Sequence, residues 1–364
     1  MELSEIRAIY NKFETATPFD AYGVYGEGNI NRTFWIEGKG GDQYILQKVN
    51  TNVFKTPVAL MDNMVGITEF LKKKIIERGG DVDRETLNIV PAKDGKTYYE
   101  DAKGGFWRMT HFVKDTVAYQ TVEKDGLLYE VARSFGHFQK LLSDYPADTL
   151  FETIPDFHNT AKRYKAFETA LADDIAHRAE GVQREVAKLK KFAPRASIIV
   201  DKLASGELPT RVTHNDTKLN NILMDKATDK GVCVIDLDTV MPGSLLYDFG
   251  DSVRFAANNG AEDDKDLSRV WLKTELYEEY VSGFLAGVGD SIITEEIRLL
   301  PMSVFILTYE LALRFMTDYL NGDTYFKLNY PEHNLIRTRA QIKLMEDIDS
   351  KLDTLAKITE KYIK

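Results

Sequence analysis

One segment of the sequence, residues 214–221, combines the side chains that phosphoryl transfer requires. It has the pattern H-x-D-x-K-x-x-N. At this spacing Asp216 can accept the proton of an attacking hydroxyl group, and Asn221 can hold a magnesium ion. A polar turn and a second apolar run follow, which predicts a hairpin that returns Asp236 beside them. We therefore predict that Asp216 is a general base and that Asn221 and Asp236 are metal ligands.

Other polar residues in this region allow more than one interpretation. Lys218 could contact the γ-phosphate or be solvated, and the sequence favours neither. His214 is interpreted as a packed scaffold residue, because the aspartate two residues later already supplies the base. Asp248 begins the letters D-F-G, which mark a metal ligand in protein kinases, but it lies twelve residues after Asp236. We interpret Asp248 as a helix cap or a brace for the catalytic loop, and Asp238 as a residue that could share the ions.

Glycines and a lysine near the N-terminus have the order found in nucleotide-binding lobes. Gly26 and Gly28 precede the first clear strand, where backbone N–H groups could approach phosphates closely. Taken alone, these glycines would suit an ordinary turn equally well. Lys48 follows in the next strand and is the candidate partner of the α- and β-phosphates. Its acidic partner could be Asp62, Glu69 or neither, because both project from the polar face of the following helix.

The first part of the chain is predicted to be a small sheet with one helix. Runs rich in β-formers at residues 33–36 and 43–49 flank a glycine-rich turn and predict a hairpin. Apolar residues at three- and four-residue spacing after Pro57 predict an amphipathic helix. Further strands at residues 97–100 and 106–113 complete this lobe.

The rest of the chain is predicted to be a larger, mainly helical lobe, interrupted by residues 210–251. The predicted fold class is therefore α+β, with a bilobal, protein-kinase-like arrangement. Residues 1–113 would form the nucleotide-binding lobe, and residues 114–364 would form the catalytic and substrate-binding lobe. We expect adenine to lie against the hinge between the lobes, near backbone groups of Met109 and Phe112.

Composition excludes several classes of partner. The chain has 47 basic and 57 acidic residues, and its net charge of −10 opposes binding to phosphate backbones, so nucleic acid is not expected. No stretch of about 18 apolar residues and no signal-peptide core occurs, so no membrane association is expected. The single cysteine, Cys233, excludes an internal disulfide and suits a reducing cytosol, so we expect a cytoplasmic protein. Its apolar neighbours predict a core position.

With these motifs assembled, the chain resembles the aminoglycoside phosphotransferase and choline kinase superfamily over nearly its whole length. Several segments are most similar to the N-acetylhexosamine 1-kinase family. These segments are residues 44–54, 154–160, 212–221 and 313–323. The catalytic motif is common to the whole superfamily, so the narrower resemblance depends on the other segments.

This resemblance implies phosphorylation of the anomeric hydroxyl of free N-acetylglucosamine or N-acetylgalactosamine, with ATP and Mg²⁺ as cofactors. The products would be the sugar 1-phosphate and ADP, and no protein partner is implied. It also implies a sugar pocket to which Arg314 and Tyr325 map. An arginine and an aromatic ring suit the hydroxyl groups and the apolar face of a sugar. Both could instead be structural, with Arg314 paired to Asp318 one helical turn away.

Two other functions are alternatives to an N-acetylhexosamine kinase. A kinase for an aminoglycoside, choline or another sugar would share the fold, but a polycationic acceptor requires an acidic pocket. The acidic run at residues 262–266 is interpreted as a solvated loop, and Arg314 would repel a cation. A catalytically silent binding protein is disfavoured because Asp216, Asn221 and Asp236 are all present.

Overall fold

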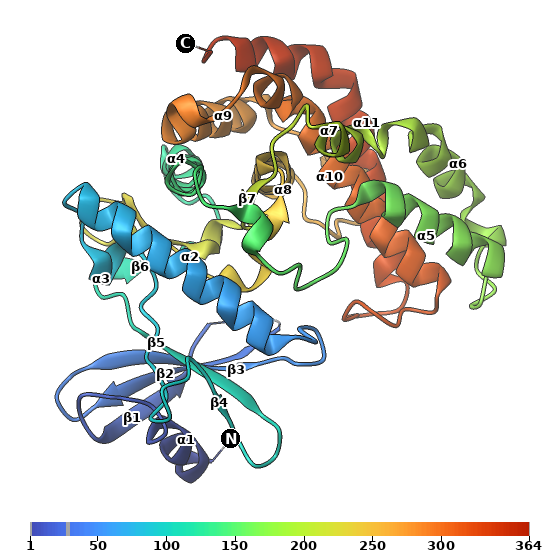
Figure 1. Cartoon of the computed structure of the whole chain (residues 1–364). Coiled ribbons are helices and arrows are strands. Elements are labelled where there is room, and N and C mark those ends of the chain that lie inside the picture. Colours follow the sequence, from blue (N-terminus) through green and yellow to red (C-terminus); the bar gives the residue numbers. More distant parts are fainter. Residues whose placement is uncertain (1, 27–29, 364) are drawn as a thin grey trace. The chain divides into compact units, whose positions relative to one another are not determined.

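The structure is a computed structural model that describes residues 2–26 and 30–363. The chain divides into two compact units, which we call the sheet unit and the helical unit (Figure 1). The sheet unit comprises Met1–Val117, Asp148–Pro155 and Leu223–Met241, and the helical unit comprises Ala118–Ala147, Asp156–Ile222 and Pro242–Lys364. The predicted division after residue 113 is a single cut, whereas the sheet unit also includes two later segments. One of them carries Asp236.

The sheet unit contains a five-stranded antiparallel sheet with the order β1-β2-β3-β5-β4. Its strands are β1 (Phe19–Val24), β2 (Arg32–Gly38), β3 (Gln43–Val49), β4 (Tyr99–Glu100) and β5 (Phe106–His111). β2 and β3 form the predicted hairpin, in which Phe34 faces Leu46. Gly41 in its turn has a φ of +80°, which glycine adopts at low steric cost. The predicted pair of later strands is also confirmed, as β4 and β5.

Helices lie against both faces of this sheet. On one face, Tyr10 of α1 (Leu3–Tyr10) packs in a buried cluster with Leu46 and Trp107. On the other face, α2 (Pro57–Glu77) begins at its proline as predicted, and Met64 on its buried side contacts Arg108 of β5. The short helix α3 (Val82–Glu85) follows α2. α1 was not predicted from the sequence.

A second, three-stranded sheet in the sheet unit leads to Asp236. It has the order β6-β8-β9, with β6 (Thr116–Val117), β8 (Ile222–Asp225) and β9 (Gly231–Val234). The predicted hairpin between the catalytic segment and Asp236 is therefore confirmed as β8 and β9. Cys233 of β9 is 2% exposed, and burial raises the pKa of its thiol to about 12, so its predicted core position is confirmed.

The helical unit is built from eight labelled helices. They are α4 (Leu127–Leu141), α5 (Thr160–Asp173), α6 (Gln183–Lys191), α7 (Ile198–Ser205), α8 (Leu245–Ala256), α9 (Thr274–Val288), α10 (Thr294–Leu320) and α11 (His333–Glu360). α10 packs against α5, α8 and α11, and α4 packs against α9. In the described chain as a whole, short 3-10 helices lie at Ala147–Thr149, Glu180–Val182, Ala193–Arg195, Leu219–Asn221, Leu237–Thr239, Leu267–Arg269 and Gly289–Ser291. The one at Leu237–Thr239 belongs to the sheet unit.

Two strands connect these helices to the catalytic segment. β7 (Arg211–Thr213) pairs with β10 (Met241–Gly243) and runs directly into residues 214–221. Arg211 forms an ion pair at 2.6 Å with the fully buried Glu296 of α10. Removal of either partner would leave a buried charge uncompensated, so this pair holds the start of the catalytic segment in place.

Glycines allow α4 and α9 to approach each other closely. A Cβ atom on Gly287 would lie 2.1 Å from the carbonyl oxygen of Arg133, and one on Gly283 would lie 2.3 Å from that of Tyr129. Both carbonyl groups belong to the α4 backbone, so a side chain at either glycine would force the helices apart. The close packing against α9 therefore restricts the movement of α4.

α10 is the one helix in the described part of the chain that is long and apolar enough to cross a membrane by length and composition. Its most apolar 18-residue window has a mean hydropathy of 1.5, and 78% of that window is buried inside the fold. A helix that is apolar around most of its circumference and buried by its neighbours is typical of the centre of a large core.

Candidate active site

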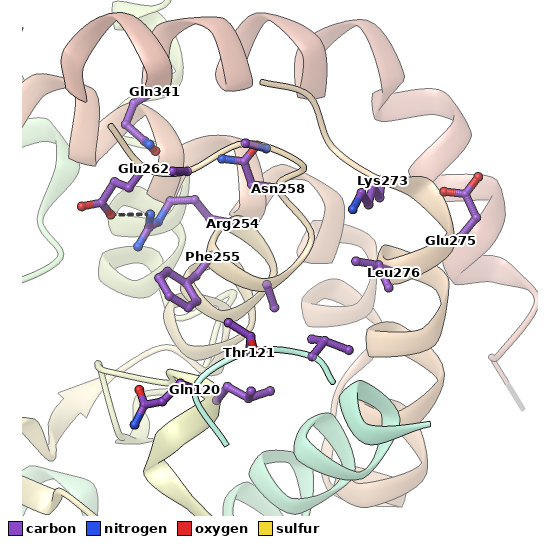
Figure 2. Close-up of a pocket in the computed structure, with 15 residues that line it drawn as sticks. Gln120, Thr121, Arg254, Phe255, Asn258, Glu262, Lys273, Glu275, Leu276 and Gln341 are labelled. Atoms are coloured by element: carbon purple, nitrogen blue, oxygen red, sulfur yellow. Dashed lines mark hydrogen bonds and ion pairs between the residues drawn. The ribbon is translucent and has the colours of Figure 1, made fainter. Parts of the chain in front are cut away.

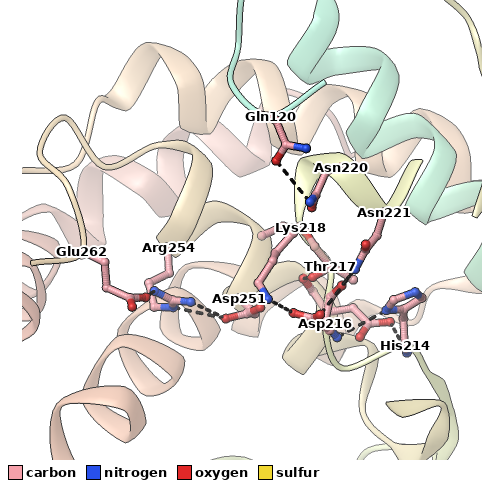
Figure 3. A network of polar contacts seen from close by, with 12 residues as sticks. Gln120, His214, Asp216, Thr217, Lys218, Asn220, Asn221, Asp251, Arg254 and Glu262 are labelled. Atoms are coloured by element: carbon pink, nitrogen blue, oxygen red, sulfur yellow. Dashed lines mark hydrogen bonds and ion pairs between the residues drawn. The ribbon is translucent and has the colours of Figure 1, made fainter. Parts of the chain in front are cut away.

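The catalytic segment brings the predicted base and one predicted metal ligand together within the helical unit (Figure 3). The side-chain amide of Asn221 donates to the carbonyl oxygen of Asp216 at 2.7 Å and lies 3.4 Å from its Oδ2. The ammonium of Lys218 lies 2.8 Å from Oδ1 of Asp216. The Asp216 side chain is 25% exposed, so an acceptor molecule can reach it.

The donor set of this segment suits a hard divalent cation. Asn221 is 6% exposed and uses its amide nitrogen in the bonds to Asp216, which leaves its side-chain oxygen for an ion. Asp236 belongs to the sheet unit, where it is exposed and has a left-handed backbone with φ near +60°. This conformation is uncommon for residues other than glycine, although aspartate adopts it more readily than most. Carboxamide and carboxylate oxygens are both ligands that Mg²⁺ accepts.

Asp248 braces the catalytic segment. Its carboxylate accepts hydrogen bonds from the backbone N–H groups of His214 at 2.9 Å and Asn215 at 2.7 Å. It also accepts one from the side chain of Gln139 in α4 at 2.6 Å. Burial raises the pKa of Asp248 above the ordinary carboxyl range, although these donors act in the opposite direction. Ser244 caps α8 instead, so of the two predicted roles the brace is confirmed and the cap is wrong.

A chain of charges extends from the base across the helical unit (Figure 3). Asp251 accepts hydrogen bonds from the buried Arg254 at 2.7 and 3.2 Å, and Arg254 also donates to Glu262 at 3.2 Å. Burial raises the pKa of Asp251, but the positive charge of Arg254 outweighs it and holds that pKa below its usual value; the charge of Lys218 adds to this effect. Charges of alternating sign therefore extend from Asp216 and Lys218 in the catalytic segment to Asp251, Arg254 and Glu262 outside it.

The acidic run at residues 262–266 is not the solvated loop that the sequence predicted. Glu262 is paired with Arg254, and Asp263 accepts from His333 at 2.9 Å. Asp264 lies 3.5 Å from Arg269. The run therefore includes partly buried, paired carboxylates, because surrounding cations reach it from other elements of the helical unit.

A cavity of about 610 Å³ lies inside the helical unit beside the catalytic segment (Figure 2). Phe255 and Leu276 form apolar parts of its wall, and Leu219 of the catalytic segment contributes another. Gln341 of α11 also lines it, and no hydrogen-bond partner is found among the described residues for its buried carboxamide. Neither Arg314 nor Tyr325 lines this cavity, so it is distinct from the predicted sugar site.

Arg314 is held by aromatic rings and not by Asp318. Its guanidinium carbon lies 5.5 Å from the ring centroids of both Phe157 and Phe326. The Asp318 carboxylate instead accepts from backbone N–H groups of the loop after α10, including that of Tyr325 at 2.8 Å. The structural alternative of an Arg314–Asp318 pair is therefore wrong. The Tyr325 side chain is 68% exposed and is free to contact a ligand.

A buried histidine and carboxylate next to Arg314 were missed by the sequence reasoning. Glu310 lies one helical turn before Arg314 and accepts from Thr160 at 2.7 Å, and its other oxygen lies 2.9 Å from Nδ1 of His158. Burial raises the pKa of Glu310, but His158 and Arg314 outweigh it and keep that pKa low. No hydrogen-bond partner is found for Nε2 of His158 among the described residues. Two features of the sequence could have indicated these residues. His158 lies in the segment 154–160 that carries the family resemblance, and Glu310 lies four residues before Arg314.

Lys48 lies on the face of the sheet that packs against α1. Its ammonium lies 5.4 Å from the ring centroid of Trp107, the residue opposite it in β5. Arg108, the next residue of β5, points to the other face and contacts α2. Neither predicted acidic residue of α2 pairs with Lys48: Glu69 is bonded to Lys72 at 2.8 Å. The role of Lys48 at the phosphates stays a prediction.

The remaining predicted nucleotide contacts lie in the sheet unit. Gly26 has a φ of +74°, and nothing lies within 4 Å of a Cβ atom placed on it. Gly28 lies outside the described residues. The carbonyl group of Met109 already accepts from Val90 at 2.9 Å, and the N–H group of Phe112 donates to Gln43 at 3.0 Å. An adenine ring would have to use other backbone groups of this segment or displace these bonds.

Comparison with known sequences places the chain in a family. The sequence model of the phosphotransferase enzyme family, APH, matches residues 23–281. The chain belongs to the phosphotransferase enzyme family. The matched region includes all predicted site residues from Gly26 to Asp236 and ends before Arg314 and Tyr325.

Solved structures of small-molecule phosphotransferases are similar over nearly the whole chain. An aminoglycoside phosphotransferase from Alicyclobacillus acidocaldarius has a TM-score of 0.65 at 14% identity, with 97% of this chain and 96% of that chain covered. A microcompartment-associated aminopropanol kinase has a TM-score of 0.62 at 16% identity, with coverage of 98% and 99%. The amicoumacin kinase hAmiN, in complex with AMP-PNP, Ca²⁺ and Ami, has a TM-score of 0.58 at 14% identity, with coverage of 96% and 94%. These likenesses confirm the predicted kinase-like fold class.

Proposed function

We propose that this phosphotransferase transfers the γ-phosphate of ATP to the anomeric hydroxyl of a free N-acetylhexosamine. The observation that carries the phosphoryl transfer is the arrangement of Asp216, Lys218 and Asn221 in a loop braced by Asp248. The choice of an N-acetylhexosamine as acceptor rests on the resemblance of residues 44–54, 154–160 and 313–323. A carboxylate held in this way can act as a positioned base for a hydroxyl group. The single, buried Cys233 suits a cytoplasmic enzyme.

In the proposed reaction, Oδ2 of Asp216 accepts a hydrogen bond from the anomeric hydroxyl, since Oδ1 is occupied by Lys218. The hydroxyl oxygen forms a bond to the γ-phosphorus while the bond from that phosphorus to the β,γ-bridging oxygen breaks. Asp216 receives the proton, and the products are the sugar 1-phosphate and ADP. The enzyme contributes mainly orientation and charge stabilisation, because a loose, metaphosphate-like transition state leaves the protein little covalent chemistry to do.

A magnesium ion would neutralise the phosphate oxygens as charge moves between them. Asn221, through its side-chain oxygen, and Asp236 are the residues that would hold it. Lys48 and the glycine segment around Gly26 are proposed to hold the phosphates. The complex of the amicoumacin kinase with AMP-PNP and Ca²⁺ supports a nucleotide and a divalent cation in a protein of this fold.

The surroundings of Arg314 support a neutral sugar as acceptor. Its guanidinium is oriented by Phe157 and Phe326, so its N–H groups can bind a hydroxyl or an N-acetyl carbonyl group. The exposed ring of Tyr325 could cover the apolar face of the sugar. The nearby Glu310 is already bonded to His158 and Thr160, which leaves Arg314 as the group that repels a cationic acceptor.

The alternative is a kinase for another small alcohol, because proteins with similar structures include an aminoglycoside phosphotransferase and an aminopropanol kinase. ADP release from Mg·ATP should be measured with N-acetylhexosamines, simple hexoses, choline, amino alcohols and an aminoglycoside. Phosphorus NMR of the product gives the position of the phosphate. A phosphate at the anomeric carbon of an N-acetylhexosamine supports the proposal. Activity only with an amino alcohol would contradict the sugar assignment and leave the base unchanged.

The base is tested with Asp216→Asn, which keeps the shape of the side chain and removes its ability to take a proton. We expect nucleotide binding to be nearly unchanged and turnover to fall by a factor of about 10² to 10⁴. Asp353→Asn, at an exposed position of α11, is the matched control and should retain full activity. Full activity of Asp216→Asn would refute the assignment.

A further inference from the structure

The sheet unit contains a buried ion pair that the proposed mechanism does not use. Arg108 of β5 is 2% exposed and Asp238 is 4% exposed, and their side chains are in direct contact. Arg108 also donates to Gln47 at 2.9 Å, and Asn31 donates to Oδ2 of Asp238. A buried ion pair adds little to stability compared with apolar residues of similar volume, because both charges lose their hydration. A contribution to stability therefore does not explain why this ion pair is present, and another role must be considered.

Asp238 lies in the turn that carries the predicted metal ligand. It belongs to the 3-10 helix at Leu237–Thr239, which begins directly after Asp236. This turn also packs against α2. Since Asp236 has a left-handed backbone, its carboxylate direction depends on how this turn is held.

Further side chains fasten the same turn. Asn63 of α2 donates to the carbonyl oxygen of Val240 at 3.0 Å, and its own oxygen accepts from the N–H group of Phe151 at 2.9 Å. Asn31, which directly follows Ile30 at the end of the glycine segment, accepts from the N–H group of Asn50 at 2.9 Å. The turn is thus held at Asp238 by the sheet and at Val240 by α2.

We propose that the Arg108–Asp238 pair is a positioning device for the metal ligand Asp236. This inference rests on the proposed function, since it assumes that Asp236 holds the cation. The pair anchors the turn to β5 of the sheet, and Asn31 links the same anchor to the end of the glycine segment. Asp238 is therefore a holder of the turn and does not share the ions, because Arg108 and Asn31 occupy its carboxylate.

The test compares divalent cation binding in variants that keep the fold. Arg108→Met combined with Asp238→Leu replaces the pair by apolar side chains, which often preserves stability. Binding of Mn²⁺ in the presence of ADP is measured from the electron paramagnetic resonance signal of the free ion, with urea unfolding as a check on folding. We expect the double variant to bind Mn²⁺ about tenfold more weakly, the effect typical of lost outer-shell support at a metal site.

Asn31→Ala is a second variant that leaves the ion pair intact, so it remains informative if the double variant does not fold. It should weaken Mn²⁺ binding by a smaller factor of about three, because one of the two holders of Asp238 remains. Asp42→Ala is the matched control, because it removes a partly buried side-chain contact with Thr17 in the same unit, away from the turn. It should bind Mn²⁺ as the wild type does.

The outcomes separate this inference from the proposed function. If the wild type binds no Mn²⁺ with ADP, the proposed function fails and the inference fails with it. If the wild type binds Mn²⁺ and the folded variants bind it equally well, only the positioning role is refuted. A rise in the dissociation constant for metal-free ADP, with Mn²⁺ binding unchanged, would identify Arg108 as a phosphate ligand and would also refute it.

Discussion

Replacing Asp248 by asparagine tests the brace of the catalytic loop most directly. The carboxylate accepts three N–H donors, from the backbones of His214 and Asn215 and from the side chain of Gln139. Asparagine offers one acceptor oxygen, and its NH₂ group must face at least one of the backbone donors. Gln139 can keep its bond to the carbonyl oxygen of Val212 at 3.0 Å, but one backbone N–H is left buried without a partner.

The loss of stability expected for Asp248→Asn can be worked out from these hydrogen bonds. Hydrogen bonds to a charged group contribute about 1.5–3 kcal/mol each, and a buried donor without a partner costs about 1–3 kcal/mol. The neutral amide avoids the desolvation that raises the pKa of Asp248, which offsets part of this loss. We therefore expect the free energy of unfolding to fall by about 3 kcal/mol. Turnover should fall by a factor of about 10 to 100, because the same N–H groups fix the backbone beside Asp216.

Urea unfolding and steady-state turnover are measured on Asp248→Asn and on Asp236→Asn in parallel. Asp236 is exposed, and asparagine tolerates its left-handed backbone, so Asp236→Asn should lose turnover with its unfolding free energy within about 0.5 kcal/mol of wild type. If Asp248→Asn is as stable as the wild type and requires more Mg²⁺, Asp248 is the metal ligand suggested by the letters D-F-G. That result would refute the reasoning from the hydrogen bonds.

Two further predictions concern packing and pH. Gly287→Ala should lower the free energy of unfolding by about 1–3 kcal/mol in urea, because its Cβ atom would overlap the carbonyl oxygen of Arg133; this exceeds the gain of up to about 1 kcal/mol in helix propensity. Asp225 accepts a hydrogen bond from Arg84 at 2.8 Å, which lowers the pKa of Asp225 from 3.8 to about 2. A pKa that is lower in the folded state contributes stability above the unfolded value and loses it as the pH falls. The difference in urea stability between wild type and Asp225→Asn should therefore be largest at pH 5 and shrink towards pH 2.

Each of these two predictions has a control or an outcome that would contradict it. Gly181→Ala places a methyl group where nothing lies within 4 Å, and it should change the free energy of unfolding by no more than about 0.5 kcal/mol. A similar loss in both glycine variants would show that the helix contact is not the cause. For Asp225, a stability difference that stays constant between pH 5 and pH 2 would contradict the pairing with Arg84.

Local spacing accounts for the parts of the site that the sequence predicted. The eight residues from 214 to 221 contain the proposed base, its neighbouring lysine and one proposed metal ligand, and these meet because a short loop keeps them within a few ångströms. The hairpin β8–β9, the helix after Pro57 and the core position of Cys233 also follow from periodicity and turn residues.

The sequence contained no comparable local signal for the directions in which side chains point across a sheet or between helices. The sequence indicated Lys48 as a phosphate ligand, and that role stays a prediction. The structure adds that the Lys48 side chain lies beside Trp107, whereas Arg108, the next residue of β5, points to α2. Sequence order could not show this, because a shift of one residue in register exchanges the two faces of a strand.

The sequence by itself was enough to predict the residues that meet in the catalytic loop and the fold class, since both depend on residue types at short, regular spacings. The tertiary structure alone decided which buried charges stabilise that chemistry. Asp248 with Gln139, Glu310 with His158, and Arg108 with Asp238 are far apart in the sequence, and each pair forms only after separate elements pack together. Because a buried polar group costs free energy until its partner is in place, these pairs are products of the packed fold.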